Sequence, residues 1–126
     1  MKKSKVSEIK REQKKSFLLQ EISALVRQIT ADESRLSSLF VTRVELSRDG
    51  GICFIYFSTH TTKEAFDEGF PLLKLYKPSM RKALSQAMSS RYVPNLVFKY
   101  DETKEKERKI TGILDKIASE DDSSDE

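Results

Sequence analysis

The sequence has few of the residues that most catalytic and metal sites require. Its 126 residues include one cysteine (Cys53), one histidine (His60) and no tryptophan. A lone cysteine excludes an internal disulfide and fits a reducing compartment. One histidine and one cysteine cannot supply the four ligands of a structural zinc. The four glycines form neither a GxGxxG nor a GxxxxGK[ST] phosphate loop. We therefore expect no enzyme, no cofactor and no metal.

Long apolar runs are also missing. No stretch approaches the ~18 apolar residues that a transmembrane helix needs. The chain starts with MKKSKVSEIKR, which is basic but has no apolar segment behind it, unlike a secretory signal. These features predict a cytoplasmic protein that does not enter the membrane.

Charge is plentiful and unevenly distributed. The net charge is +3, but residues 119–126 carry five acids and no base, so residues 1–118 hold 23 bases against 15 acids. A basic body attracts polyanions through phosphate contacts and counterion release. We expect a basic flexible N-terminus over 1–7, one folded domain over 8–118 and an acidic disordered tail over 119–126. The tail is interpreted as a solubilising segment, with weak competition against RNA as the alternative.

Helical periodicity appears near both ends of the chain. Residues 8–29 have an apolar stripe at 3.6-residue spacing in their second half, formed by Leu18, Ile22, Leu25 and Ile29. The first half of this helix instead carries cations, which we expect to face solvent or a partner: Lys10, Arg11, Lys14 and Lys15. A last helix after Asp101 has a similar stripe from Ile110 to Ile117 behind the polar segment ETKEKERK.

Alternating segments predict a β-hairpin at residues 40–47 and 52–58. Asp49-Gly50 between them fits a two-residue type I′ turn, in which both residues need positive φ. This turn pairs Leu46 with Cys53 and Val44 with Ile55. The core face is then expected to carry Phe40, Thr42, Val44, Leu46, Cys53, Ile55 and Phe57. The opposite face has Arg43 beside Phe54 and Tyr56, which could stack on unpaired bases, although ordinary cross-strand packing is the simpler interpretation.

Two prolines interrupt the helical region that follows. A helix is expected to start near Thr62, with Thr61 and Glu64 at capping-box spacing. Pro71 predicts either a kink near Phe70 or a helix that restarts there. Pro78 predicts a junction before a second helix from about Ser79 to Ser90. A third strand follows over 96–100.

The junction between these helices is rich in positive charge. Basic side chains flank it on both sides: Lys74, Lys77, Arg81, Lys82 and, at the end of the second helix, Arg91. A helix N-terminus offers unpaired N–H groups and a positive dipole, which suit a phosphodiester. We expect the fold to gather these cations on one surface that binds RNA.

These segments resemble ribosome-binding factor A, a family of bacterial small-subunit assembly proteins. The resemblance covers residues 10–117 and is carried by REQKKSFLLQEISALVRQI, VTRVELSRD, RYVPNL and FKYDET, in family order. It implies an α+β fold of the type II KH-like class, a three-stranded mixed sheet with helices on one face and the order α-β-β-α-α-β-α. It also implies binding to small-subunit rRNA and to the immature small subunit. We expect the protein to be a monomer without a small-molecule substrate.

The resemblance further implies a helix–kink–helix with an Ala-x-Gly signature. That signature falls on Tyr76-Lys77-Pro78, where this sequence has neither the alanine nor the glycine. The family's basic surface carries over to Lys74, Lys77, Arg81 and Lys82, and to the cations of the first helix. Two alternatives remain open: a protein-interaction module that docks through ETKEKERK, and a small enzyme acting at Cys53 or His60.

Overall fold

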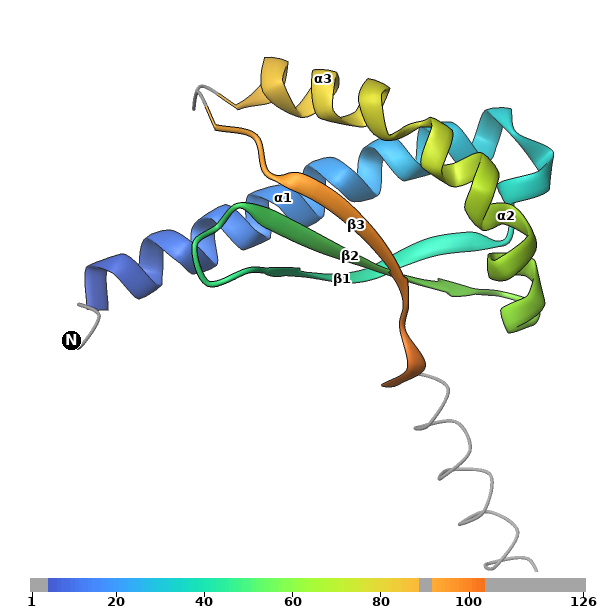
Figure 1. Ribbon diagram of the computed structural model, residues 1–126, viewed down its shortest axis with the longest axis horizontal. Helices are drawn as coiled ribbons and strands as arrows, with labels where there is room; N and C mark the ends of the chain where they lie inside the picture. The colour runs from blue at the N-terminus through green and yellow to red at the C-terminus, as the bar shows by residue number, and fades with distance from the viewer. Residues whose placement is uncertain (1–4, 89–91, 104–126) are drawn as a thin grey trace, which may run out of the picture.

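The structure is a computed structural model that describes residues 5–88 and 92–103 (Figure 1). Its elements are α1 (Lys5–Asp32), the 3-10 turn η1 (Ser34–Leu36), β1 (Leu39–Leu46), β2 (Ile52–Thr59), α2 (Lys63–Leu75), α3 (Lys77–Ala87) and β3 (Asn95–Tyr100). Arg91, the acidic tail and nearly all of the expected terminal helix lie outside the described residues.

Helix α1 buries its apolar side chains beside β1 through its second half. Leu18, Ile22 and Val26 are buried, while Leu25 and Ile29 pack at the edge of the core. The stripe begins only at Leu18 because the earlier positions are mostly charged or polar. The helix is already formed at Lys5, the first residue that the structure describes and three residues before the expected boundary.

The sheet is mixed, with the order β1-β2-β3. β1 and β2 are antiparallel, and Leu46 pairs with Cys53 and Val44 with Ile55, as predicted. β3 runs parallel to β2. Three helices on one face of a three-stranded mixed sheet confirm the predicted type II KH-like α+β class (Figure 1).

A β-bulge in β1 corrects the predicted core face. Val41 pairs with Phe57 and Arg43 with Tyr56, so Thr42 is an extra residue without a partner across the ladder. The bulge reverses the alternation on its N-terminal side. Val41 packs against the core in place of Thr42, and Leu39 is buried in place of Phe40. The Phe40 ring instead stacks on His60, with 4.5 Å between ring centroids.

The hairpin loop also differs from the prediction. Gly50 has a φ of 75°, and it is the one residue with positive φ among those described, so the type I′ assignment is wrong for Asp49. The Gly50 amide donates to the Ser47 carbonyl at 2.9 Å, and the Ser47 amide donates to the Ile52 carbonyl at 2.8 Å. The loop is therefore longer than the two residues expected, and its left-handed position falls on a glycine.

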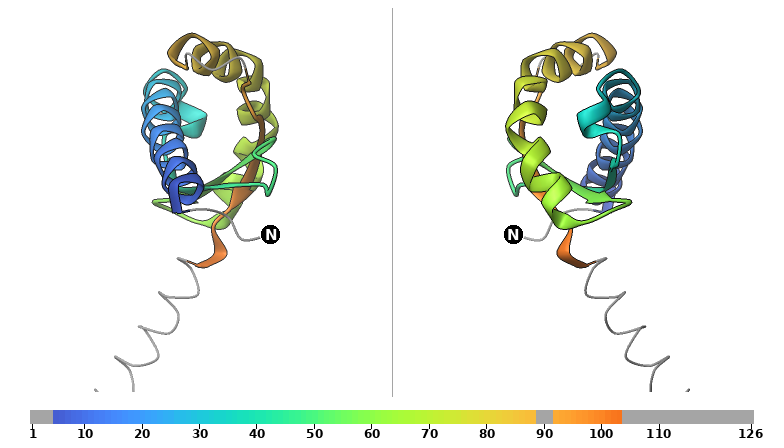
Figure 2. Two further views of the ribbon diagram at one scale, coloured as in Figure 1. Left: turned by 90° about the vertical axis from the view of Figure 1, so that its left-hand side faces the viewer. Right: turned by 90° about the vertical axis from the view of Figure 1, so that its right-hand side faces the viewer.

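The core fills the space between the sheet and the helices. Seen end-on, α1, α3, α2 and the sheet close around this shared interior (Figure 2). It contains Cys53, Ile55 and Phe57 of β2, and the Phe98 ring meets Phe57 edge-to-face at 5.3 Å. Within the described ranges, no helix is long and apolar enough to cross a membrane.

Candidate nucleic-acid interface

Helices α2 and α3 are separated by a single residue, Tyr76. With φ −83° and ψ −8°, Tyr76 ends α2 and precedes α3, and the chain changes direction between the two helices (Figure 1). Pro78 lies in the first turn of α3, where its missing N–H has no intrahelical partner to lose. Pro71 lies inside α2, which continues through it, so the alternative in which the helix restarts at Pro71 is wrong.

The cations at this junction fall into two environments. Lys74, Arg81 and Lys82 are exposed. Lys77 is half-buried, and its ammonium lies 5.1 Å from the centroid of the Phe98 ring. The α2–α3 junction therefore presents three solvent-facing positive charges and a fourth that also covers the core.

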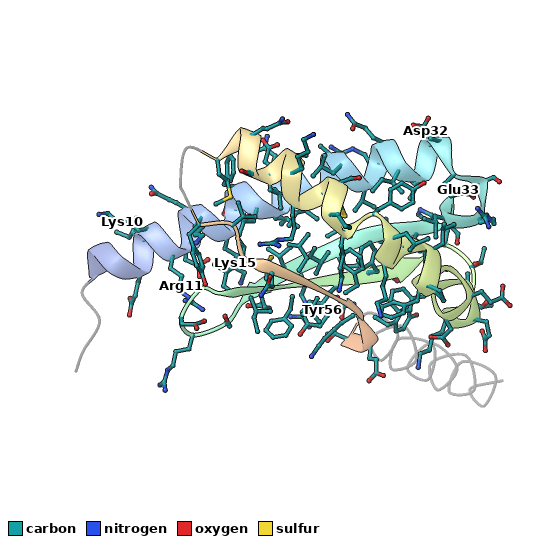
Figure 3. The ribbon with its side chains drawn as sticks, turned by 45° about the horizontal axis from the view of Figure 1, so that its top comes forward. Lys10, Arg11, Lys15, Asp32, Glu33 and Tyr56 are labelled. Carbon is teal, nitrogen blue, oxygen red and sulfur yellow. The ribbon has the colours of Figure 1, made fainter. Side chains whose placement is uncertain are left out.

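The cations of α1 mostly contact the hairpin. The Arg11 guanidinium donates to the backbone carbonyls of Leu46 at 2.8 Å, Ser47 at 3.0 Å and Arg48 at 3.3 Å. The Lys15 ammonium lies 3.1 Å from the Glu45 carboxylate. Figure 3 shows Lys10, Arg11 and Lys15 along the N-terminal part of α1, at the other end from Asp32 and Glu33. Arg11 and Lys15 thus hold the hairpin in place.

Lys10 and Lys14 differ from their two neighbours. Lys10 is exposed, whereas Lys14 is half-buried, with its ammonium near Gly50 of the hairpin loop. The first half of α1 was expected to face solvent or a partner. That expectation fits Lys10 and is wrong for Arg11 and Lys15, because the hairpin lies against this part of the helix.

Arg43 lies on the sheet face away from the helices. Its guanidinium carbon is 3.7 Å from the centroid of the Tyr56 ring, and its Nε is 3.4 Å from the Asp101 carboxylate. On the same face the Lys99 ammonium is 4.8 Å from the Phe54 ring centroid. Each ring already has a cation over it, which favours cross-strand packing over base stacking. The sheet separates Arg43 from α3, so Arg43 does not share a surface with the cations at the α2–α3 junction.

A groove beside α3 contains an aromatic residue that the sequence reasoning did not single out. It has a volume of about 400 Å³ and is lined by Arg81, Lys82, Ser85, Tyr92 and Val93. The Tyr92 side chain is 59% exposed. The signal in the sequence was an aromatic residue between a basic helix and the Val-Pro entry to β3, but only the packing of that segment against α3 makes it part of a groove.

The candidate nucleophiles are poorly placed for chemistry. Cys53 is fully buried, and that burial raises the pKa of its thiol to about 11. His60 is exposed and stacks on Phe40. In the described part of the chain, no group of three or more histidine, cysteine or acidic side chains is arranged to hold a metal ion.

Asp101 fixes the point where the chain leaves β3. Its carboxylate accepts a hydrogen bond from the Thr42 hydroxyl at 2.6 Å and one from the Thr103 amide at 3.0 Å. Burial raises the pKa of Asp101, but these two hydrogen bonds and the charge of Arg43 outweigh it, so the pKa lies below its ordinary value. The bulge at Thr42 is what brings its hydroxyl to this carboxylate.

The fold and the surface together define an α+β domain of the KH-like class with a basic helix pair. The family model "Ribosome-binding factor A" matches residues 10–114. The chain therefore belongs to the ribosome-binding factor A family. A relative from Pelobacter propionicus is 29% identical over 116 residues, covering 92% of this chain and 95% of that protein. One from Heliobacterium modesticaldum is 33% identical over 102 residues, covering 81% and 84%.

Solved structures show the same fold. The crystal structure of ribosome-binding factor A from Thermus thermophilus superposes with a TM-score of 0.61 at 21% identity, covering 71% of this chain and 94% of that one. A homology model of the Thermus thermophilus protein, fitted into a cryo-EM map of its 30S complex, gives a TM-score of 0.51 at 22% identity, covering 68% of this chain and 93% of that one.

Proposed function

We propose that this protein is a non-catalytic assembly factor that binds the rRNA of the immature small ribosomal subunit through the α2–α3 face. The observation that carries the proposal is the group of cations at the Tyr76 junction, three of them exposed: Lys74, Lys77, Arg81 and Lys82. Membership of the ribosome-binding factor A family supports it, as does the relative of the same fold that was fitted into a 30S complex.

Binding alone accounts for this activity. A protein that docks better on one conformation of a maturing RNA shifts the population toward that conformation, in proportion to the difference in affinity. No covalent step is required, and the buried Cys53 thiol offers no reactive nucleophile. The protein would act as a monomer in the cytoplasm, where small ribosomal subunits are assembled.

Charge reversal at the junction tests the proposal. The variant is Lys74→Glu, Arg81→Glu and Lys82→Glu, with Lys77 left intact because it packs over Phe98. A control of equal charge change is Arg27→Glu, Arg48→Glu and Lys63→Glu, which reverses three exposed cations away from the junction. The assay is co-migration with small subunits in a low-salt gradient. The triple variant should leave the subunit peak, while the control remains in it.

Salt dependence provides a second measure of the same contacts. Four cations on phosphates predict a log–log slope of affinity against salt of about −3. The proposal fails if the wild-type protein never co-migrates with small subunits at low salt. If instead the triple variant still binds and deletion of residues 102–118 abolishes binding, the charged C-terminal segment is the docking element.

A further inference from the structure

The groove beside α3 combines two kinds of chemistry in one place. Arg81 and Lys82 are neighbours on α3 and Ser85 follows one turn later, whereas Tyr92 and Val93 come from the segment that leads into β3. Both cations and Ser85 are exposed. One wall of the groove is therefore polar and positively charged, and the other presents a phenol ring.

Arg81 reaches across the groove. Its Nη2 donates to the Val93 carbonyl at 3.3 Å in an exposed hydrogen bond. A guanidinium has five N–H donors, so this bond leaves donors for an anion. Arginine is the side chain that best grips a phosphate with two parallel bonds, and Lys82 adds a point charge beside it.

Tyr92 is positioned by the hairpin loop. A methyl group placed on Gly51 would lie 3.1 Å from the Tyr92 hydroxyl oxygen. The hydroxyl end of the side chain therefore lies against the hairpin loop that joins β1 and β2. The side chain is nevertheless 59% exposed.

We propose that this groove binds one unpaired nucleotide of an RNA strand, with its base against the Tyr92 ring and its phosphate on Arg81 and Lys82. The inference rests on the proposed function and names the form of RNA that this part of the surface recognises. A base stacks on an aromatic side chain only when it is unstacked from its neighbours, so the groove selects single-stranded RNA over duplex. An acidic peptide would use the cations but gain little from the ring.

The test compares two RNA probes of equal charge by fluorescence anisotropy: an unstructured oligonucleotide and a short hairpin duplex. Tyr92→Leu should weaken binding of the unstructured probe about 10-fold, the order expected for one stacked base. Binding of the duplex should change less than about 2-fold, because its phosphates contact only the cations. Tyr92→Phe keeps the ring and should bind both probes like the wild type.

The absence of tryptophan allows a direct readout of stacking. Tyr92→Trp introduces the only tryptophan, and its emission should be quenched by the unstructured probe but not by the duplex. Urea unfolding of each variant establishes that it is folded. Tyr92→Trp keeps an aromatic ring, so its emission reports stacking even if the Tyr92→Leu effect arises from local collapse of the groove.

The possible failures are distinguishable. If the wild-type protein binds neither probe and leaves the small-subunit peak, the proposed function is wrong. If the wild type binds but Tyr92→Leu affects both probes equally or neither, or the Tyr92→Trp emission does not respond, the nucleotide site is wrong while the proposed function stands. A polyglutamate peptide that displaces RNA and binds more tightly than the unstructured probe would also overturn the site.

Discussion

Arg11 provides the sharpest test of how this domain uses its charge. Sequence reasoning places Arg11 among the RNA-binding cations, but in the structure its guanidinium donates to three consecutive hairpin carbonyls at 2.8, 3.0 and 3.3 Å. The bonds to Leu46 and Ser47 are partly buried, and the bond to Arg48 is exposed. We therefore expect Arg11 to stabilise the folded domain by holding α1 against the hairpin.

The magnitude follows from these contacts. A hydrogen bond from a charged group contributes about 1.5–3 kcal/mol when it is buried. Because these carbonyls are partly exposed and regain water when Arg11 is removed, we expect Arg11→Ala to lower the free energy of unfolding by about 2 kcal/mol. Arg11→Lys keeps the charge but loses the fork that reaches several carbonyls, so about half of that loss is expected.

Urea unfolding at neutral pH measures these changes, with Lys10→Ala as the matched control. Lys10 is an exposed neighbour on the same helix turn, and its removal should change stability by less than about 0.5 kcal/mol. Amide exchange at the hairpin should quicken in Arg11→Ala and not in the control. Equal stabilities for Arg11→Ala and Lys10→Ala, with unchanged exchange, would refute the reasoning and return Arg11 to the group of cations predicted to bind RNA.

Three further predictions follow from buried positions. Gly69→Ala should destabilise the domain by about 1 kcal/mol in urea despite alanine's better helix propensity, because its methyl group would lie 2.7 Å from Cδ2 of the buried Leu36; a gain in stability would contradict this packing. Asp101→Asn should cost about 1–2 kcal/mol at pH 7. Because the folded pKa of Asp101 is below its ordinary value of 3.8, its contribution is complete above that value and is lost as the pH falls through the folded pKa, so the wild type and the variant should converge in acid unfolding. The Cys53 thiol, with its pKa raised to about 11, should react with a disulfide reagent at pH 8 only as fast as the protein unfolds, and rapid labelling of the native protein would show that the site is open.

The helices and strands could be predicted because their hydrophobic periodicity depends only on residues that are close in the sequence. The apolar stripe of α1 and the alternation of β1 and β2 give the correct elements. The pairing of Leu46 with Cys53 is also as predicted, although the loop between the strands is longer than the two-residue turn from which it was derived. The break between α2 and α3 was visible from Pro78, since proline is tolerated in the first turn of a helix and not later without cost.

The errors arose where a distant part of the chain decides the outcome. The bulge at Thr42 lies between the pairs Val41–Phe57 and Arg43–Tyr56. It brings the Thr42 hydroxyl to Asp101, 59 residues away, which local alternation does not reveal. From the sequence, Arg11 is predicted to be a surface cation. Its hydrogen-bond acceptors are hairpin carbonyls 35 to 37 residues later, which only folding brings beside it.

The sequence by itself determined the family, the class of fold, the order of its elements and the excess of positive charge around the helix junction, because these depend on composition and on spacing along the chain. Tertiary structure alone decided which cations face solvent, and it brought Tyr92 beside Arg81 and Lys82 in one groove. The physical reason is that the sequence states which side chains are charged or aromatic. Whether such a side chain can contact a partner depends on the carbonyls, carboxylates and rings that folding places beside it.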